Sequence, residues 1–317
     1  MNLKYILMRV IGAVPLIIGT SIVLFGVIHL APGGPTDVYA DNPSVTKEAL
    51  EQIRTAYGLD RPIWAQYALW FGSMLRGDWG YSIRTGRPVF QDVVERLGPT
   101  FELGGLSLAI SLSLALPLGV IGAARQNSPR DHALTLLSFS GISIPVFWLA
   151  LLLQLLFSIV LGWLPSAGYQ SIGDGSFGDR LAHIAMPVTV LSLATIASWS
   201  RYVRAGMLDV LHQEYIRTAY AKGQTEWGVL VHHALRNALL PAVTIIALDF
   251  ASVISGAVIT ETVFAWPGIG RLFIESMDGR DYPVLMGLML MGSMALILAN
   301  LMADLVYAAI DPRIRYD

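Results

Sequence analysis

Cysteine is absent from this sequence, and charged residues are scarce. The lack of cysteine among 317 residues excludes disulfides, thiolate metal sites and cysteine nucleophiles together. Only 14% of the residues are charged, against about 25% in an average soluble domain. Because 54% are hydrophobic, more than a soluble core can absorb, several membrane spans are expected. The net charge of −2, with no basic stripe, argues against nucleic acid as a partner.

The short motifs of common enzymes and nucleotide-binding proteins are also missing. The sequence has no G-x-x-x-x-G-K-[ST] phosphate loop, no H-E-x-x-H metal motif and no G-x-S-x-G nucleophile turn. The adjacent histidines His232 and His233 would project about 100° apart on a helix and cannot converge on one ion. We therefore expect no catalytic residue, metal or cofactor in this chain. Energy for any work it does must come from elsewhere.

Long uncharged runs predict an all-α membrane protein with six transmembrane helices. Each run can cross about 30 Å of hydrocarbon at about 1.5 Å per residue. The predicted spans cover residues 10–31, 104–124, 135–161, 184–200, 238–260 and 283–303. The first run is too long for a signal-peptide core and lacks a cleavage site, so we expect it to be retained.

The distribution of lysine and arginine predicts the orientation of these spans. The N-terminus, the turn at 125–133, the insert at 201–237 and the C-terminus together hold 11 of the 21 basic residues. Under the positive-inside rule this side is cytoplasmic. The chain then divides into a cytoplasmic N-terminus with the first span (1–31), an extracytoplasmic insertion (32–99), a five-span core (100–310) and a cytoplasmic tail (311–317).

The insertion at 32–99 is predicted to contain short helices at 46–57, 62–75 and 89–97. The second is read as an amphipathic helix lying along the membrane surface. Two interpretations of its surroundings stay open: aromatic residues at a membrane interface, or packing residues of a small extramembrane domain. The residues concerned are Trp64, Trp70, Trp79 and Tyr81.

The insert at 201–237 is the most informative polar stretch. It carries eight charged residues: Arg201, Arg204, Asp209, Glu214, Arg217, Lys222, Glu226 and Arg236. Placing them at mid-bilayer would cost on the order of 20 kcal/mol, so the insert must lie in water. We expect a helix over 207–222, a turn at Gly223 and a second helix capped by Thr225 that runs to 238. The pattern alone is equally consistent with a hairpin that covers the bundle end and with a docking element for a cytoplasmic partner.

Two carboxylates near the fifth span are candidate pathway residues. Asp249 lies near the middle of that span, where ionisable groups usually face the bundle interior or a wet cavity. It could line a translocation path, make a structural hydrogen bond or couple protons. Glu261 lies at the end of the span, where a helix-end contact, a gate contact or simple solvation are all consistent with its position.

Several motifs resemble those of permease subunits in the dipeptide/oligopeptide/nickel family of ABC importers. The insert is similar to the cytoplasmic "EAA" loop of such permeases. Gly223 matches the motif glycine and Ala219 a motif alanine, whereas Arg217-Thr218 stand where the general motif has Glu-Ala. The matching runs extend over nearly the whole chain: Leu30-Ala31-Pro32-Gly33, Leu59-Asp60-Arg61-Pro62, Arg76-Gly77-Asp78, Ser143–Trp148, Leu161–Pro165, Tyr215–Gly223, His233–Pro241, Glu261–Phe264 with Pro267–Gly270, and Asp311-Pro312-Arg313.

This resemblance implies a six-span type I permease that forms half of a translocation pathway for di- or oligopeptides in the bacterial inner membrane. It implies four kinds of partner: a second homologous permease, two ATP-binding cassette subunits that bind ATP and Mg²⁺, an extracytoplasmic solute-binding protein, and the lipid bilayer around the spans. The residues implied for ATPase coupling are Glu214, Tyr215, Arg217, Thr218, Ala219, Lys222 and Gly223. If Asp249 lines the translocation path, it would face the ammonium group of a peptide. An ion- or proton-coupled secondary carrier is the alternative, but it predicts several ionisable groups at the midplane, where only Asp249 lies.

Overall fold

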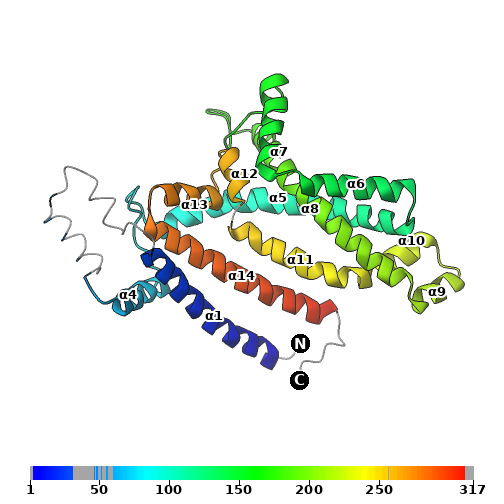
Figure 1. Ribbon diagram of the computed structural model, residues 1–317, viewed down its shortest axis with the longest axis horizontal. Coiled ribbons are helices and arrows are strands. Elements are labelled where there is room, and N and C mark those ends of the chain that lie inside the picture. Colours follow the sequence, from blue (N-terminus) through cyan, green and yellow to red (C-terminus); the bar gives the residue numbers. More distant parts are fainter. Residues whose placement is uncertain are drawn as a thin grey trace.

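The protein is a bundle of helices, seen in a computed structural model that describes residues 3–30, 46, 48, 51, 55, 60–255 and 257–310 (Figure 1). No strand occurs in this part of the chain, and Tyr81 and Pro88 form an isolated antiparallel bridge. The main helices are α1 (Leu3–Leu30), α4 (Ile63–Leu75), α5 (Val89–Ala124), α6 (Pro129–Ser143), α7 (Val146–Leu153), α8 (Phe177–Leu211), α9 (Glu214–Ala221), α11 (Arg236–Ser255), α12 (Val258–Val263), α13 (Ile269–Asp278) and α14 (Tyr282–Ile310). The all-helical class predicted from the sequence is confirmed.

Four helices are long and apolar enough to cross a membrane within the described ranges, or five if one bent pair counts as a span. The four are 11–30 of α1, α5, α8 and 282–301 of α14. α11 occupies most of the predicted fifth span and packs between α8 and α14. The count of six spans remains a prediction. The expected tail at 311–317 and most of the expected helix at 46–57 lie outside the described residues.

The predicted third span, 135–161, is broken into two helical segments. α6 ends at Ser143, and the following helical segment, Val146–Val160, is bent from it by 95°. The cause is Pro145, because the residue before a proline is disfavoured in the α conformation. Ile144 is accordingly extended, with φ −81° and ψ 121°. The second half of this segment, Gln154–Val160, is a π-helical stretch.

The helices α5 and α8 form the centre of the bundle, and both are longer than expected. α5 absorbs the predicted short helix at 89–97, and α8 continues past Ser200 into the polar insert. Small residues allow the two helices to pack closely. At Gly119 there is no room for a side chain, because an added Cβ would lie 2.6 Å from the Val203 side chain. The hydroxyl of Ser192 donates to the Ser107 carbonyl at 3.2 Å. Such small and hydroxylated contacts are common between membrane helices.

An ion pair fixes the first turn of α6 against α8. Arg204 donates through Nε and Nη2 to the two carboxylate oxygens of Asp131, at 2.6 and 2.7 Å. Asp131 also accepts from the Asn127 backbone at 2.9 Å, and its side chain is 3% exposed. Because the pair is bidentate and largely shielded from water, it orients both helices strongly.

Candidate functional site

The polar insert forms a helical hairpin attached to one end of the bundle (Figure 1). α8 ends at Leu211, the extended residue Gln213 separates it from α9, and the predicted continuous helix over 207–222 is therefore wrong. The break lets α9 fold back, so that Ile216 reaches the bundle core. The turn at Gly223 is confirmed, with φ +79°, a conformation that favours glycine. Thr225 caps the next helical segment as predicted, accepting from the Gly228 backbone at 3.2 Å.

One face of this hairpin is built into the bundle. A buried apolar cluster joins α5, α8, α9, α11 and the π-helical stretch Val229–Leu235; we call it the hairpin core. Its buried members are Val120, Ala123, Val203, Met207, Ile216, Ala219, Val229, Leu230, Ala234, Ala238 and Ala242. We call α8 and α11, the helices that enter and leave the hairpin, its arms. The arms approach so closely at Gly206 that an added Cβ would lie 2.4 Å from the Ala238 carbonyl oxygen. Asn237 of α11 also donates to the Tyr215 hydroxyl of α9 at 2.7 Å. The hairpin is therefore packed directly against α5, α8 and α11.

The other face of the hairpin is exposed and carries six of the seven residues expected at a coupling site. These are Glu214, Tyr215, Arg217, Thr218, Lys222 and Gly223. Ala219 is the exception, because it is 6% exposed and packs inside the hairpin core. Its small side chain allows close packing within this chain, whereas the sequence interpretation had it contact a partner. Arg217 pairs with Glu214 at 3.0 Å, with both side chains largely in water, so this pair contributes little to stability.

Two aromatic residues on the exposed face were missed by the sequence interpretation. Tyr220 is 43% exposed and Trp227 is 62% exposed, and they flank the Gly223 turn. Exposed tyrosine and tryptophan are typical of protein interfaces. The available signal was the presence of large aromatic side chains in a loop that must lie in water.

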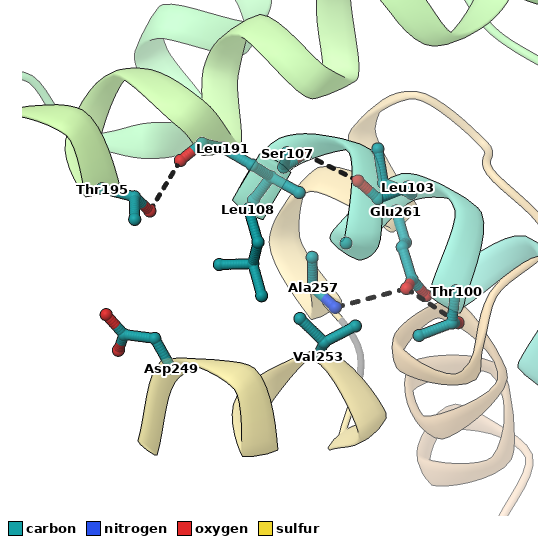
Figure 2. A pocket seen from close by; sticks show the side chains of 11 residues that line it. Thr100, Leu103, Ser107, Leu108, Leu191, Thr195, Asp249, Val253, Ala257 and Glu261 are labelled. Carbon is teal, nitrogen blue, oxygen red and sulfur yellow. Dashed lines mark hydrogen bonds between the residues drawn. The ribbon is translucent and has the colours of Figure 1, made fainter. Parts of the chain in front are cut away.

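A pocket lies deeper in the bundle, between α5, α8, α11 and α12. Its volume is about 220 Å³, and its walls are mainly apolar. Figure 2 shows Asp249 and Glu261 on opposite sides of it, with Leu108 and Val253 between them. A small-molecule site typically measures about 300–1,000 Å³, so this pocket is large enough for one side chain or one chain terminus.

Asp249 is held by a hydrogen bond from the neighbouring helix. The indole Nε1 of Trp199 donates to its Oδ2 at 2.6 Å. Trp199 is 2% exposed, while Asp249 is partly buried and lines the pocket. The role of Trp199 was not predicted, because a single sequence does not show which residue of α8 lies opposite Asp249 of α11.

Glu261 also lines the pocket, but its carboxylate accepts hydrogen bonds from α5 and from the starts of α12 and α13. Its Oε1 accepts from the Thr100 hydroxyl at 3.1 Å and from the Ala257 backbone at 3.2 Å. Its Oε2 accepts from the Arg271 backbone at 3.0 Å. The residue is fully buried, and a carboxylate near a helix N-terminus is favoured by the helix dipole. The sequence was consistent with a helix-end contact, a gate contact or simple solvation of Glu261. The structure contains the helix-end contact, made to the backbone of Arg271.

Comparison with known proteins assigns the chain to a family. The family described as "Binding-protein-dependent transport system inner membrane component" matches residues 115–316, and its N-terminal counterpart matches residues 2–104. The oligopeptide transport system permease protein AppB of Bacillus subtilis is 42% identical over 98% of this chain and 99% of its own. The dipeptide transport system permease protein DppB of Escherichia coli K12 is 37% identical, covering 99% of each chain. The chain belongs to this family of inner-membrane transport components.

A solved structure supports the same fold. A chain of the MetNI methionine ABC transporter, in an inward-facing conformation, matches with a TM-score of 0.55 over 69% of this chain and 96% of that chain. The sequence identity is 17%, so this likeness concerns the fold alone. The protein is thus a multi-pass inner-membrane permease of an ABC importer, a transport component rather than an enzyme, that works with ATPase and substrate-binding partners. The self-sufficient secondary carrier is not favoured.

Proposed function

We propose that this chain is the permease subunit that forms half of the pathway for di- or oligopeptides in an ATP-driven importer. The proposal rests on relatives named as oligopeptide and dipeptide permeases that align over nearly the full chain. A second homologous permease supplies the other half, and an extracytoplasmic solute-binding protein delivers the peptide. Two ATP-binding cassette subunits bind ATP and Mg²⁺, and this chain needs no cofactor of its own.

The hairpin is the element on which the ATPase subunits dock. The observation that carries this assignment is its division into two faces: an exposed polar and aromatic face, and an apolar face inside the hairpin core. A partner that moves the exposed face would move three long helices with it. The docking residues are Glu214, Tyr215, Arg217, Thr218, Lys222 and Gly223, joined by Tyr220 and Trp227, whereas Ala219 supports them from within.

Both termini are cytoplasmic in this proposal. The start of α1 and the end of α14 lie towards the end of the bundle that carries α9 and the short helix α10 (Glu226–Gly228) (Figure 1). The excess of lysine and arginine in the hairpin and at the termini supports the same side.

Asp249 lines the pathway and meets the ammonium group of the peptide. The pocket beside it is too small for a whole peptide but accommodates one terminus. The bond from Trp199 occupies Oδ2; a carboxylate offers about four lone-pair sites, so it can accept a further donor. Glu261 contributes to the pocket wall and shapes it by holding α13.

Uptake of a radiolabelled dipeptide tests the docking assignment in cells that lack other peptide permeases. The variant Tyr220→Ala/Trp227→Ala should lose about tenfold or more in uptake rate, because exposed aromatic residues at interfaces often contribute about 2 kcal/mol or more. It should also lose co-purification of the ATPase subunit at unchanged membrane abundance. The matched control is Trp163→Ala, another exposed tryptophan outside the hairpin. Equal uptake by both variants would rule out docking through these two residues.

The peptide assignment is tested separately with the unaltered chain. The complete importer should take up di- or oligopeptides, and its ATPase activity should rise when the loaded binding protein is added. An importer that hydrolyses ATP on docking but transports no peptide would contradict the substrate while leaving the hairpin proposal intact.

A further inference from the structure

The helix α4 has an unusual composition for a helix in an extracytoplasmic loop. Its 13 residues, Ile63–Leu75, include no charged side chain. Charged residues flank it at both ends, with Arg61 before it and Arg76 after it. At about 1.5 Å per residue it is about 20 Å long, which is too short to cross about 30 Å of hydrocarbon.

One side of α4 packs against α1 through aromatic and polar contacts. The Tyr67 hydroxyl is hydrogen-bonded to Ser21 Oγ at 2.9 Å, and His29 Nε2 contacts Gln66 Oε1 at 3.2 Å. The Phe25 ring lies 5.5 Å from the rings of both Tyr67 and Trp70. Figure 1 shows α4 beside the end of α1 that is remote from the hairpin.

These contacts fix the position of α4 along α1. The apolar stretch of α1 runs from 11 to 30, and Ser21 lies at its centre, nine residues before Leu30. Nine helical residues correspond to about 14 Å, close to half the thickness of the hydrocarbon core. The side chain of Tyr67 therefore contacts the middle of the apolar stretch of α1, while the neighbouring Gln66 contacts His29 near its end.

The side of α4 that faces away from α1 is apolar and exposed. Trp64 is 72% exposed, Leu69 is 50% exposed and Leu75 is 74% exposed, with Ile63 and Ala68 also exposed. α1 also has exposed apolar residues, among them Val23 and Val27. The polar groups Gln66 and Tyr67 make their hydrogen bonds within the protein, Gln66 donating to the Arg61 carbonyl at 2.8 Å. That is what a hydrocarbon environment demands of buried polar groups.

We propose that α4 is embedded in the leaflet that surrounds the end of α1, and that its exposed face binds lipid acyl chains. Arg61 and Arg76 extend from its two ends towards the headgroups, as long basic side chains do near helix ends. α4 then lies within the leaflet, whereas the sequence predicted a helix along the membrane surface. This inference depends on the membrane location of α1 and stands whatever the substrate is.

Spin-label accessibility tests the proposal directly. The chain contains no cysteine. Ala68→Cys and Leu69→Cys therefore each create a single labelling site in it, and no native cysteine has to be removed first. The controls are Val23→Cys on the lipid-facing side of α1 and Arg61→Cys in the flank of α4. Each labelled full chain is studied with its transport partners in nanodiscs of phosphatidylethanolamine and phosphatidylglycerol. The collision rates of the label with oxygen and with a polar nickel chelate are measured.

The expected result is a ratio of oxygen to nickel collisions at 68 and 69 that matches Val23. It should exceed the ratio at Arg61 by about tenfold, because a polar chelate is excluded from hydrocarbon. A high nickel rate at 68 and 69 would place α4 in water and overturn the proposal. Low rates for both reagents would mean that protein, such as a second permease, covers this face, and would overturn it equally. Dipeptide uptake by each variant verifies that the labelled chains are correctly assembled.

Discussion

The indole nitrogen of Trp199 donates to a carboxylate oxygen of Asp249 at 2.6 Å, which joins the helix that enters the hairpin to the helix that leaves it. Along α8, Trp199 lies seven residues before Gly206, where the two arms come into close contact. The pocket wall and the docking hairpin are thus parts of the same pair of helices. Movement of the arms relative to each other would change the position of the Asp249 carboxylate.

Removing the indole N–H should weaken both stability and transport. Trp199→Phe keeps an aromatic ring in the buried site but leaves Asp249 without this donor. Hydrogen bonds to charged groups contribute about 1.5–3 kcal/mol, so we expect a loss of that size. Thermal unfolding of the purified protein in detergent measures it. Wild-type stability in Trp199→Phe would show that the bond contributes nothing.

Asp249→Asn separates a structural role from a substrate role. The amide oxygen of asparagine still accepts the bond from Trp199, so stability should change by less than about 1 kcal/mol. Loss of the negative charge should raise the peptide concentration for half-maximal uptake by about tenfold, as expected when a charge-assisted contact becomes neutral. An acetylated peptide, which has no ammonium group, serves as the control substrate and should show no such difference. Equal responses to both substrates would remove Asp249 from ammonium recognition.

The sequence predicted the helical class and the elements with strong local signals. Gly223 and Thr225 were assigned correctly because a left-handed turn and an N-cap depend on one residue and its immediate neighbours. The bend at Pro145 was missed although proline signals it, because the long uncharged stretch was divided by length alone. The break at Gln213 has no such signal: it follows from the burial of Ile216 in the hairpin core, a tertiary effect.

The contacts of the candidate site could not be predicted for the same reason. Asp249 and Glu261 were selected as carboxylates near a span, but their partners Trp199 and Thr100 lie on other helices. Ala219 was selected as a coupling residue because it matches a motif alanine. Whether the closely packed neighbour belongs to this chain or to a partner depends on how α9 folds back, which only the three-dimensional arrangement decides.

Gly268→Ala should disrupt the contacts that hold the start of α13. A Cβ at this position would lie 2.3 Å from Glu261 Cδ. The backbone conformation, with φ −100°, suits any residue, so the effect is steric. Displacing the carboxylate would leave the Arg271 N–H and the Thr100 hydroxyl without their acceptor, and we expect a loss of at least about 2 kcal/mol. Gly175→Ala is the matched control, since its Cβ would meet nothing within 4 Å; the same melting shift in both variants would contradict this explanation.

Gly206→Ala should separate the hairpin arms. Its Cβ would lie 2.4 Å from the Ala238 carbonyl oxygen, and a backbone atom cannot move aside as a flexible side chain can. We expect dipeptide uptake to fall by at least about tenfold, as misplacement of a coupled element by about 1 Å can have that effect. Gly105→Ala, also helical but with open space around the Cβ, should keep uptake near wild type. Normal uptake in Gly206→Ala at normal abundance would show that close contact between the arms is not needed.

The ion pair between Arg204 and Asp131 gives a final test of how α8 is held. Arg204→Leu leaves a carboxylate that is 3% exposed without its charged partner, and breaking such a pair costs about 3–5 kcal/mol. Arg204→Lys should recover only part of this, because an ammonium group cannot reproduce the bidentate contact. The double variant Arg204→Leu/Asp131→Leu removes the unpaired charge and should be more stable than Arg204→Leu alone. Thermal unfolding of the three variants measures these differences, and a double variant less stable than Arg204→Leu would show that Asp131 stabilises the turn mainly through the Asn127 backbone rather than through α8.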